Sequence, residues 1–219
     1  MTKEQVRGCI EAIAIIPAVR VSSQEDALFA CEAVAHAGIP IVELTMTVPG
    51  AVDLLAAMWK HNPGVIAGAG TVLDLDTAKR CVDAGAQFLT SPGLELDLVE
   101  FANRSGVLVL PGALTPTEVL TAWKVGGDMV KVYPCSQVGG AKYIRSLKGP
   151  FPKIPLIASG GVNHHTAPEF ILAGAAALGI GGNLIPKEAI QKRQPERIAE
   201  LARRFRETVA EARALMAPR

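Results

Sequence analysis

The stretch TPTEVLTAWKVGGDMVKVYP, residues 115–134, contains one complete helix-to-strand unit. Thr115-Pro116 is a typical helix start, and Gly126 follows the amphipathic segment 117–125 as a helix stop. The segment 129–133 is a short apolar run that ends at a proline, as buried strands do. The stretch therefore predicts a surface helix that leads into a buried strand.

The same unit recurs along the chain at a spacing of roughly twenty residues. The other short apolar runs are 13–19, 41–45, 65–69, 87–90, 107–110, 156–158 and 177–180. Amphipathic stretches of helical length lie between them, for example 24–37, 51–61, 74–84 and 96–105. This alternation is typical of an α/β protein with a parallel sheet, and eight units fit a closed (β/α)8 TIM barrel. An open doubly wound sheet is the alternative.

All 219 residues are expected to form one barrel domain, because no Ser/Gly/Pro-rich linker or charge block divides the chain. An extra N-terminal helix at about 2–12 precedes the first strand, and a C-terminal helix at about 195–215 ends the chain. Aromatic residues make up only 5% of the composition and hydrophobic residues 49%. The core must therefore consist of Ala, Val, Ile and Leu, which suits a layered strand-and-helix fold.

Charge and cysteine usage exclude several classes of protein. A formal net charge of +1 argues against binding to nucleic acid or to a membrane surface, since both require a basic excess. The four cysteines are widely spaced, without a C-x-x-C pair, and no early apolar stretch is long enough for a secretory signal. The longest uncharged run, 170–186, is interrupted by glycines and does not predict a membrane span. We therefore expect a reduced, cytoplasmic protein.

Lys131 is the one lysine that lies inside an apolar strand. Alternation places Val130 and Val132 against the helices and Lys131 toward the barrel centre. Because burial of an ammonium is costly, such a site favours the neutral amine, which can attack a ketone. A lysine that only pairs with Glu43 for structure is the alternative interpretation.

Glu43 is the matching anomaly, a carboxylate within the apolar strand 41–45. If its face points inward, Glu43 can reach Lys131 and move protons during Schiff-base chemistry. A structural counter-ion is the alternative. The two residues together predict a catalytic pair inside the barrel.

Other polar residues and glycines stand at the C-terminal ends of strands, where barrels of this type place their active sites. Arg20, Thr71, Pro92 and Ser159 are the candidates for substrate binding. Two glycine turns follow the last two strands and suggest a phosphate site, since backbone N–H groups there can approach an anion closely. These turns could also be simple tight turns; their residues are Gly160, Gly161, Gly181, Gly182 and Asn183.

No metal site is expected. His164 and His165 are adjacent, so their side chains would diverge on a helix, and no carboxylate or histidine cluster at ligand spacing accompanies them. Neither a metal nor another cofactor is therefore predicted.

Six motifs occur in the same order as in class I 2-keto-3-deoxy-6-phosphogluconate (KDPG) aldolases, also called 4-hydroxy-2-oxoglutarate aldolases, and the chain resembles that family from about residue 13 to residue 186. The motifs are IPAVR (16–20), VELT (42–45), GAGTVL (68–73), SPG (91–93), VKVYP (130–134) and SGGV (159–162).

The resemblance implies a (β/α)8 barrel, commonly a homotrimer, that reversibly cleaves a 2-keto acid to pyruvate and an aldehyde without a metal. The aldehyde would be glyceraldehyde 3-phosphate or glyoxylate. It implies that Lys131 is the Schiff-base lysine and Glu43 the general acid and base. Arg20 and Thr71 would hold the substrate, and Gly160, Gly161 and Gly182 would bind its phosphate.

The chain departs from the family pattern at the mouth of the barrel. Many relatives read Glu-x-Thr-x-Arg-Thr after the second strand, and here Thr47 stands at the arginine position. Asn183 replaces a frequent serine, and Cys135-Ser136 replaces an Ala-Glu pair. These departures concern the choice of keto acid rather than the Schiff-base chemistry.

Two other functions fit the same barrel. A phosphate-sugar isomerase or epimerase would use the glycine turns with Lys131 as an electrostatic group, and a non-catalytic barrel would only bind a phosphorylated metabolite. The fold alone does not separate these from an aldolase.

Overall fold

A computed structural model gives the structure of the protein and describes residues 1–61 and 64–216. Its sheet has the strand order β5-β4-β3-β2-β1-β9-β8-β7-β6, and every pair of neighbouring strands is parallel. The strands are β1 (Ile15–Val19), β2 (Ile41–Thr45), β3 (Ile66–Gly70), β4 (Phe88–Thr90), β5 (Leu108–Leu110), β6 (Gly112–Ala113), β7 (Val130–Val132), β8 (Leu156–Ser159) and β9 (Ala175–Ile180).

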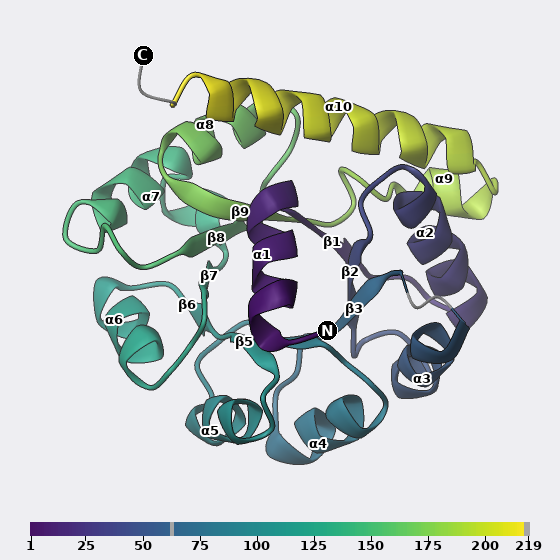
Figure 1. Ribbon diagram of the computed structural model, residues 1–219. Coiled ribbons are helices and arrows are strands. Elements are labelled where there is room, and N and C mark those ends of the chain that lie inside the picture. Colours follow the sequence, from purple (N-terminus) through teal and green to yellow (C-terminus); the bar gives the residue numbers. More distant parts are fainter. Residues whose placement is uncertain (62–63, 217–219) are drawn as a thin grey trace.

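Helices alternate with the strands and form a ring around them (Figure 1). They are α1 (Lys3–Ile13), α2 (Gln24–His36), α3 (Ala51–His61), α4 (Leu75–Asp83), α5 (Leu96–Arg104), α6 (Pro116–Lys124), α7 (Ala141–Lys148), α8 (Thr166–Leu172), α9 (Lys187–Gln191) and α10 (Pro195–Ala214), with a 3₁₀ turn η1 (Cys135–Val138). The predicted α/β barrel is confirmed, and most of its elements begin and end within two residues of the predicted bounds.

Local capping explains these bounds. Thr2 and Thr115 each accept a hydrogen bond from the backbone of the first helical turn and form a capping box. Asp74 and Ser23 cap α4 and α2 in the same way. The N-terminal helix therefore begins at Lys3, one residue after its predicted start, because Thr2 is the cap.

Nine strands build a barrel of eight because β5 and β6 are two parts of one barrel strand, separated only by Pro111. β5 pairs with β4, while β6 pairs with β7. The backbone N–H groups of Asp128 and Lys131 donate to the carbonyls of Val109 and Pro111, each at 2.9 Å, and complete the ring. Closure of the ring leaves no exposed sheet edge and directs alternate side chains into the interior.

Two glycines of β3 shape that interior. A Cβ at Gly68 would lie 2.3 Å from the ring of the buried Phe88, and a Cβ at Gly70 would lie 2.3 Å from a carboxylate oxygen of Glu43. β3 thus contributes no side chain at these two positions, and its neighbours β4 and β2 fill the space.

Helix α1 lies across one end of the barrel, in the centre of Figure 1. It packs against β9 and β5, and the Lys3 ammonium forms a 2.9 Å ion pair with Asp128, just before β7 begins. This end carries the N-terminal ends of the strands. The opposite end, where the predicted site residues lie, is left open by α1.

Helix α10 covers α2 and α8 on the outside of the barrel. Its Arg213 guanidinium donates to the carbonyls of Glu11, Ala12 and Ala176, and so joins the last helix to α1 and β9. In residues 1–61 and 64–216, no helix has the length and apolar character needed to cross a membrane.

Gly112→Ala tests the joint between β5 and β6. A Cβ there would lie 2.2 Å from the backbone of Pro92, which cannot yield as a flexible side chain could. We expect the substitution to lower the free energy of unfolding by about 1–3 kcal/mol, measured by urea denaturation. Gly8→Ala is the control, because nothing lies within 4 Å of a Cβ at that position in α1. Equal stability of Gly112→Ala and the unsubstituted chain would contradict the close approach.

Candidate active site

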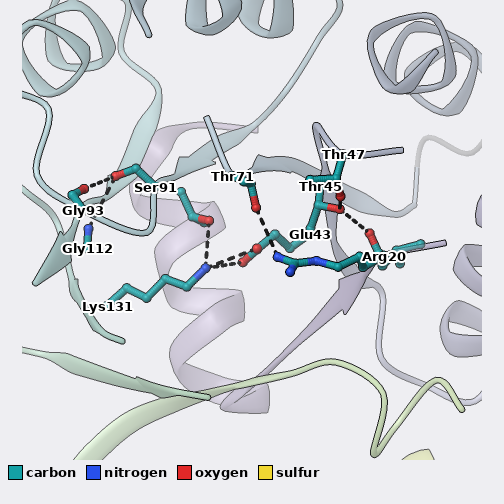
Figure 2. A network of polar contacts seen from close by, with 11 residues as sticks. Arg20, Glu43, Thr45, Thr47, Thr71, Ser91, Gly93, Gly112 and Lys131 are labelled. Atoms are coloured by element: carbon teal, nitrogen blue, oxygen red, sulfur yellow. Dashed lines mark hydrogen bonds and ion pairs between the residues drawn. The ribbon is translucent and has the colours of Figure 1, made fainter. Parts of the chain in front are cut away.

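Lys131 and Glu43 form an ion pair inside the barrel, as the sequence predicts (Figure 2). The Nζ of Lys131 lies 3.3 and 3.4 Å from the two carboxylate oxygens of Glu43, and 3.2 Å from Oγ1 of Thr90. The side chains of Lys131 and Glu43 are only 11% and 4% exposed. Val130 and Val132, which flank Lys131, are buried on the other face of β7.

Thr90 is a contact that sequence reasoning missed. It is the last residue of β4 and is 1% exposed, and its hydroxyl accepts a hydrogen bond from Lys131. Alternation within β4 could have located it, but a threonine in a strand is not anomalous as a buried lysine is. The Lys131 amine is thus held by two residues, Glu43 on β2 and Thr90 on β4.

Arg20 and Thr71 come together at the edge of the same cluster. A guanidinium nitrogen of Arg20, which follows β1, lies 3.4 Å from Oγ1 of Thr71, which follows β3. Figure 2 shows the Glu43 carboxylate between the ends of Lys131 and Arg20. A cation beside the buried Lys131–Glu43 pair is suited to bind a carboxylate.

Thr71 adopts a left-handed backbone conformation with φ of 58°. This conformation is unfavourable for a β-branched residue and persists only where the surroundings enforce it. The following residue, Val72, donates its N–H to the carbonyl of Thr90 at 3.1 Å, which fixes the turn. The sequence marks Thr71 as a candidate, but its backbone geometry is visible only in the structure.

Thr45 and Thr47 lie beside Arg20 in Figure 2. Their hydroxyls are 2.8 Å apart, and Thr45 also donates to the carbonyl of Val19. Thr47 thus supplies a small, neutral side chain at this position, with its hydroxyl already in a hydrogen bond.

Pro92 lies in the turn after β4 and is half-buried. The hydroxyl of Ser91 donates to the carbonyl of Gly93 at 2.5 Å and accepts from the N–H of Gly112 at 3.4 Å. These contacts hold the Pro92 turn against β6. They place Pro92 at the C-terminal end of the barrel, and in the part of the chain that the structure describes no hydrogen bond joins it to Lys131.

The two predicted phosphate turns lie together. Gly160 and Gly161 follow β8 with φ of 86° and 83°, a conformation that favours glycine. The side-chain amide of Asn183, in the turn after β9, donates to the carbonyl of Val162 at 2.8 Å. Asn183 therefore joins the two turns to each other. The sequence predicts Asn183 as part of an anion site, but it does not predict this contact.

Side chains surround the Gly160-Gly161 turn closely. A Cβ at Gly160 would lie 3.3 Å from the ring of Tyr133, and a Cβ at Gly161 would lie 2.2 Å from the hydroxyl of Ser136. Tyr133 stands two residues after Lys131 and is 37% exposed. Sequence reasoning did not select Tyr133 as a site residue, although the two-residue spacing places it on the same strand face as the lysine.

Ser159 ends β8 and faces β9, where a Cβ at its partner Gly179 would lie 2.8 Å from its hydroxyl oxygen. It is half-buried. Ser159 is thus at the barrel mouth with Gly160, but no hydrogen bond connects it with Lys131 or Glu43 in the described chain.

Cys135 and His164 are two further side chains with functional groups that could react. Burial raises the pKa of the Cys135 thiol to about 12, so it stays protonated and is a poor nucleophile. The His164 ring stacks on Phe205 at 3.7 Å, and burial is the main cause that lowers its pKa. Among the described residues, no group of three or more His, Cys, Asp or Glu side chains is arranged to hold a metal ion.

The chain is similar to a known family of aldolases. The sequence model of the KDPG and KHG aldolase family matches residues 6–201. KHG/KDPG aldolase of Escherichia coli K12 is 32% identical over 190 residues, which is 86% of this chain and 89% of that protein.

Two solved structures are similar throughout. Native KDPGal has a TM-score of 0.84 at 29% identity, over 91% of this chain and 96% of the other. KDPG aldolase from Legionella pneumophila, with pyruvate captured as a covalent carbinolamine, has a TM-score of 0.83 at 30% identity, over 89% and 95%.

Gly70→Ala tests how Glu43 is positioned. The added Cβ would lie 2.3 Å from Oε1 and 2.5 Å from Cγ of Glu43, so the carboxylate must move relative to Lys131. We expect the rate of Schiff-base formation with pyruvate, followed by borohydride trapping, to fall about 100-fold. Gly64→Ala, before the other end of β3, is the matched control, since nothing lies within 4 Å of a Cβ there. An unchanged rate in Gly70→Ala would show that the position of Glu43 does not matter.

Proposed function

The chain belongs to the KDPG and KHG aldolase family, and from this premise we propose that it cleaves a 2-keto acid through a Schiff base on Lys131. It is a class I aldolase, an aldehyde-lyase, whose substrates are KDPG, 4-hydroxy-2-oxoglutarate or both. The observation that carries the proposal is the buried contact between the Lys131 amine and the Glu43 carboxylate.

This contact can perform each proton transfer that the reaction needs. Transfer of a proton from the Lys131 ammonium to Glu43 frees the amine, which attacks the keto carbon. Glu43 moves a proton from the nitrogen to the oxygen of the carbinolamine and then protonates its hydroxyl, which releases water and leaves an iminium and an ionised Glu43. Removal of the proton from the C4 hydroxyl by Glu43 then breaks the C3–C4 bond and releases C4 as the carbonyl of the aldehyde, while the bonding electrons move into the iminium to form an enamine. Protonation of the enamine at C3 and hydrolysis release pyruvate and the free amine.

We propose that Arg20 and Thr71 bind the carboxylate next to the keto group. Their 3.4 Å contact and their place beside Glu43 support this role. A guanidinium can form two parallel hydrogen bonds to a carboxylate, which fixes the orientation of the keto carbon relative to the amine. Pro92 and Ser159 would complete the walls around the substrate.

We propose that the backbone N–H groups of the two glycine turns bind the substrate phosphate. The positive φ values of Gly160 and Gly161 and the link from Asn183 to Val162 support a preformed anion site. Gly181, Gly182 and Asn183 would contribute from the second turn. This site serves KDPG, while 4-hydroxy-2-oxoglutarate would place a carboxylate there.

We also propose that the chain acts as a single barrel domain in a homotrimer in the cytoplasm. Four free cysteines support a reducing compartment. Two leucines near the barrel mouth support a contact with another copy, because Leu73 and Leu96 are 57% and 54% exposed.

Covalent trapping tests the reaction. Incubation with pyruvate and borohydride is expected to attach a reduced pyruvyl group to Lys131, located by peptide mass spectrometry. Lys131→Met should abolish the adduct, and Glu43→Gln should slow its formation about 10²–10⁴-fold, since it removes the general acid and base.

Lys124→Gln is the control, because Lys124 lies in the last turn of α6, away from the site. An active protein that forms no adduct on Lys131 would overturn the proposal. Activity that survives in Lys131→Arg would favour an isomerase or epimerase, and ligand binding without turnover would favour a binding barrel.

Light scattering after size-exclusion chromatography tests the trimer. We expect a mass of three chains for the unsubstituted protein and a smaller species for Leu73→Glu, since a buried carboxylate at an apolar interface is costly. Leu172→Glu, at the end of α8, is the matched control with a leucine that is 40% exposed. A monomer of the unsubstituted chain would contradict the trimer.

A further inference from the structure

A cavity of about 450 Å³ lies between the ends of β1 and β2 and helices α2 and α9. Arg20, which contacts Thr71, lines it together with Thr47 and with Gly182 of the second glycine turn. Lys187, the first residue of α9, also lines it. The cavity thus joins the proposed carboxylate site to the second glycine turn.

The carboxylate in this cavity is already in an ion pair. Asp26 lies 2.7 Å from the Arg193 guanidinium, which also binds Glu25 at 2.6 Å and lies 5.1 Å from the centre of the Phe29 ring. Arg193 therefore holds the chain after α9 against α2 and offsets the charge of Asp26.

The two cationic side chains that line the cavity, Arg20 and Lys187, differ from Asp26 in their pairing. In residues 1–61 and 64–216, neither Arg20 nor Lys187 forms an ion pair, and Arg20 has only its contact with Thr71. The lining has two cations, Arg20 and Lys187, and one carboxylate, Asp26, so the cavity carries an excess of positive charge. Such a cavity attracts an anionic ligand group.

Arg20 and Lys187 line the same cavity from different elements. Arg20 follows β1 and reaches Thr71, beside Glu43, so it is placed for the carboxylate next to the keto group. Lys187 begins α9 and lines the cavity together with Gly182. Thr47, which also lines the cavity, is uncharged.

We propose that Lys187 is a specificity-determining residue that binds the distal anionic group of the 2-keto acid, a phosphate monoester or a carboxylate. This proposal rests on the proposed aldolase function. Lys187 supplies a side-chain cation to the cavity that Gly182 also lines, and so adds selectivity for substrates with a second negative charge.

Kinetics with three substrates test it. KDPG has a distal phosphate, 4-hydroxy-2-oxoglutarate has a distal carboxylate, and 2-keto-3-deoxygluconate has a neutral hydroxyl at that end. For Lys187→Gln, we expect the ratio of kcat/KM for an anionic substrate to that for the neutral one to fall about tenfold, through KM, because one charge-assisted hydrogen bond is lost. Lys187→Arg should restore most of the ratio, and Lys124→Gln should leave it unchanged.

The ratio for each anionic substrate tells which group Lys187 binds. A fall for KDPG alone assigns a phosphate subsite, a fall for 4-hydroxy-2-oxoglutarate alone assigns a carboxylate subsite, and a fall for both assigns a general anion subsite. Unchanged ratios, or equal losses with all three substrates, would overturn the proposal.

A binding measurement separates this proposal from the aldolase function. Glycerol 3-phosphate has a phosphate monoester but no keto group, so its binding by calorimetry does not need the Schiff base. We expect its Kd to rise about tenfold in Lys187→Gln and to stay the same in Lys124→Gln. A missing pyruvate adduct on Lys131 with this binding difference intact would contradict the aldolase function alone. An adduct together with equal Kd values would contradict the role of Lys187 alone.

Discussion

The buried ion pair between Lys131 and Glu43 is the interaction on which the rest of the structure depends. Removal of two charges from water is costly, and their attraction offsets that cost only when the geometry is good and further hydrogen bonds are made. The closed barrel meets both conditions, since β2 and β7 place the two groups 3.3 Å apart and β4 adds the Thr90 hydroxyl. Gly70 leaves the volume that the carboxylate occupies. A functional constraint thus explains features of the strands that stability alone would not require.

Much of this arrangement could be predicted because it depends on alternation along strands. An amine or a carboxylate within an apolar run is anomalous, so Lys131 and Glu43 were identifiable, and the period of two placed both inside the barrel. Thr90 occupies an equivalent inward position but is an ordinary strand residue, so nothing in the sequence singled it out. The division of one barrel strand at Pro111 was also not predictable, since it depends on the pairing of β5 with β4 and of β6 with β7.

The remaining details were not accessible to sequence reasoning because they arise from contacts between distant segments. Thr71 is a plausible substrate contact from its position, but its left-handed backbone is enforced by the turn against β4. Asn183 is predicted to contribute to an anion site from its position, but its hydrogen bond to the carbonyl of Val162 depends on the packing of two turns. In both cases the residue type permits several conformations, and the tertiary structure selects one.

The site separates chemistry from substrate choice. The groups that would form and break bonds stand on β2, β4 and β7, where a shift in one strand would disturb its hydrogen-bonded neighbours. The groups that face the rest of the substrate stand in turns and at the start of α9, where a side chain can change without moving the barrel. A change at Thr47 or Lys187, which both line the cavity, would therefore alter its charge while Lys131 keeps its partners. Substrate preference can therefore differ between members of the family, because a side chain at the barrel mouth can change without moving Lys131 or Glu43.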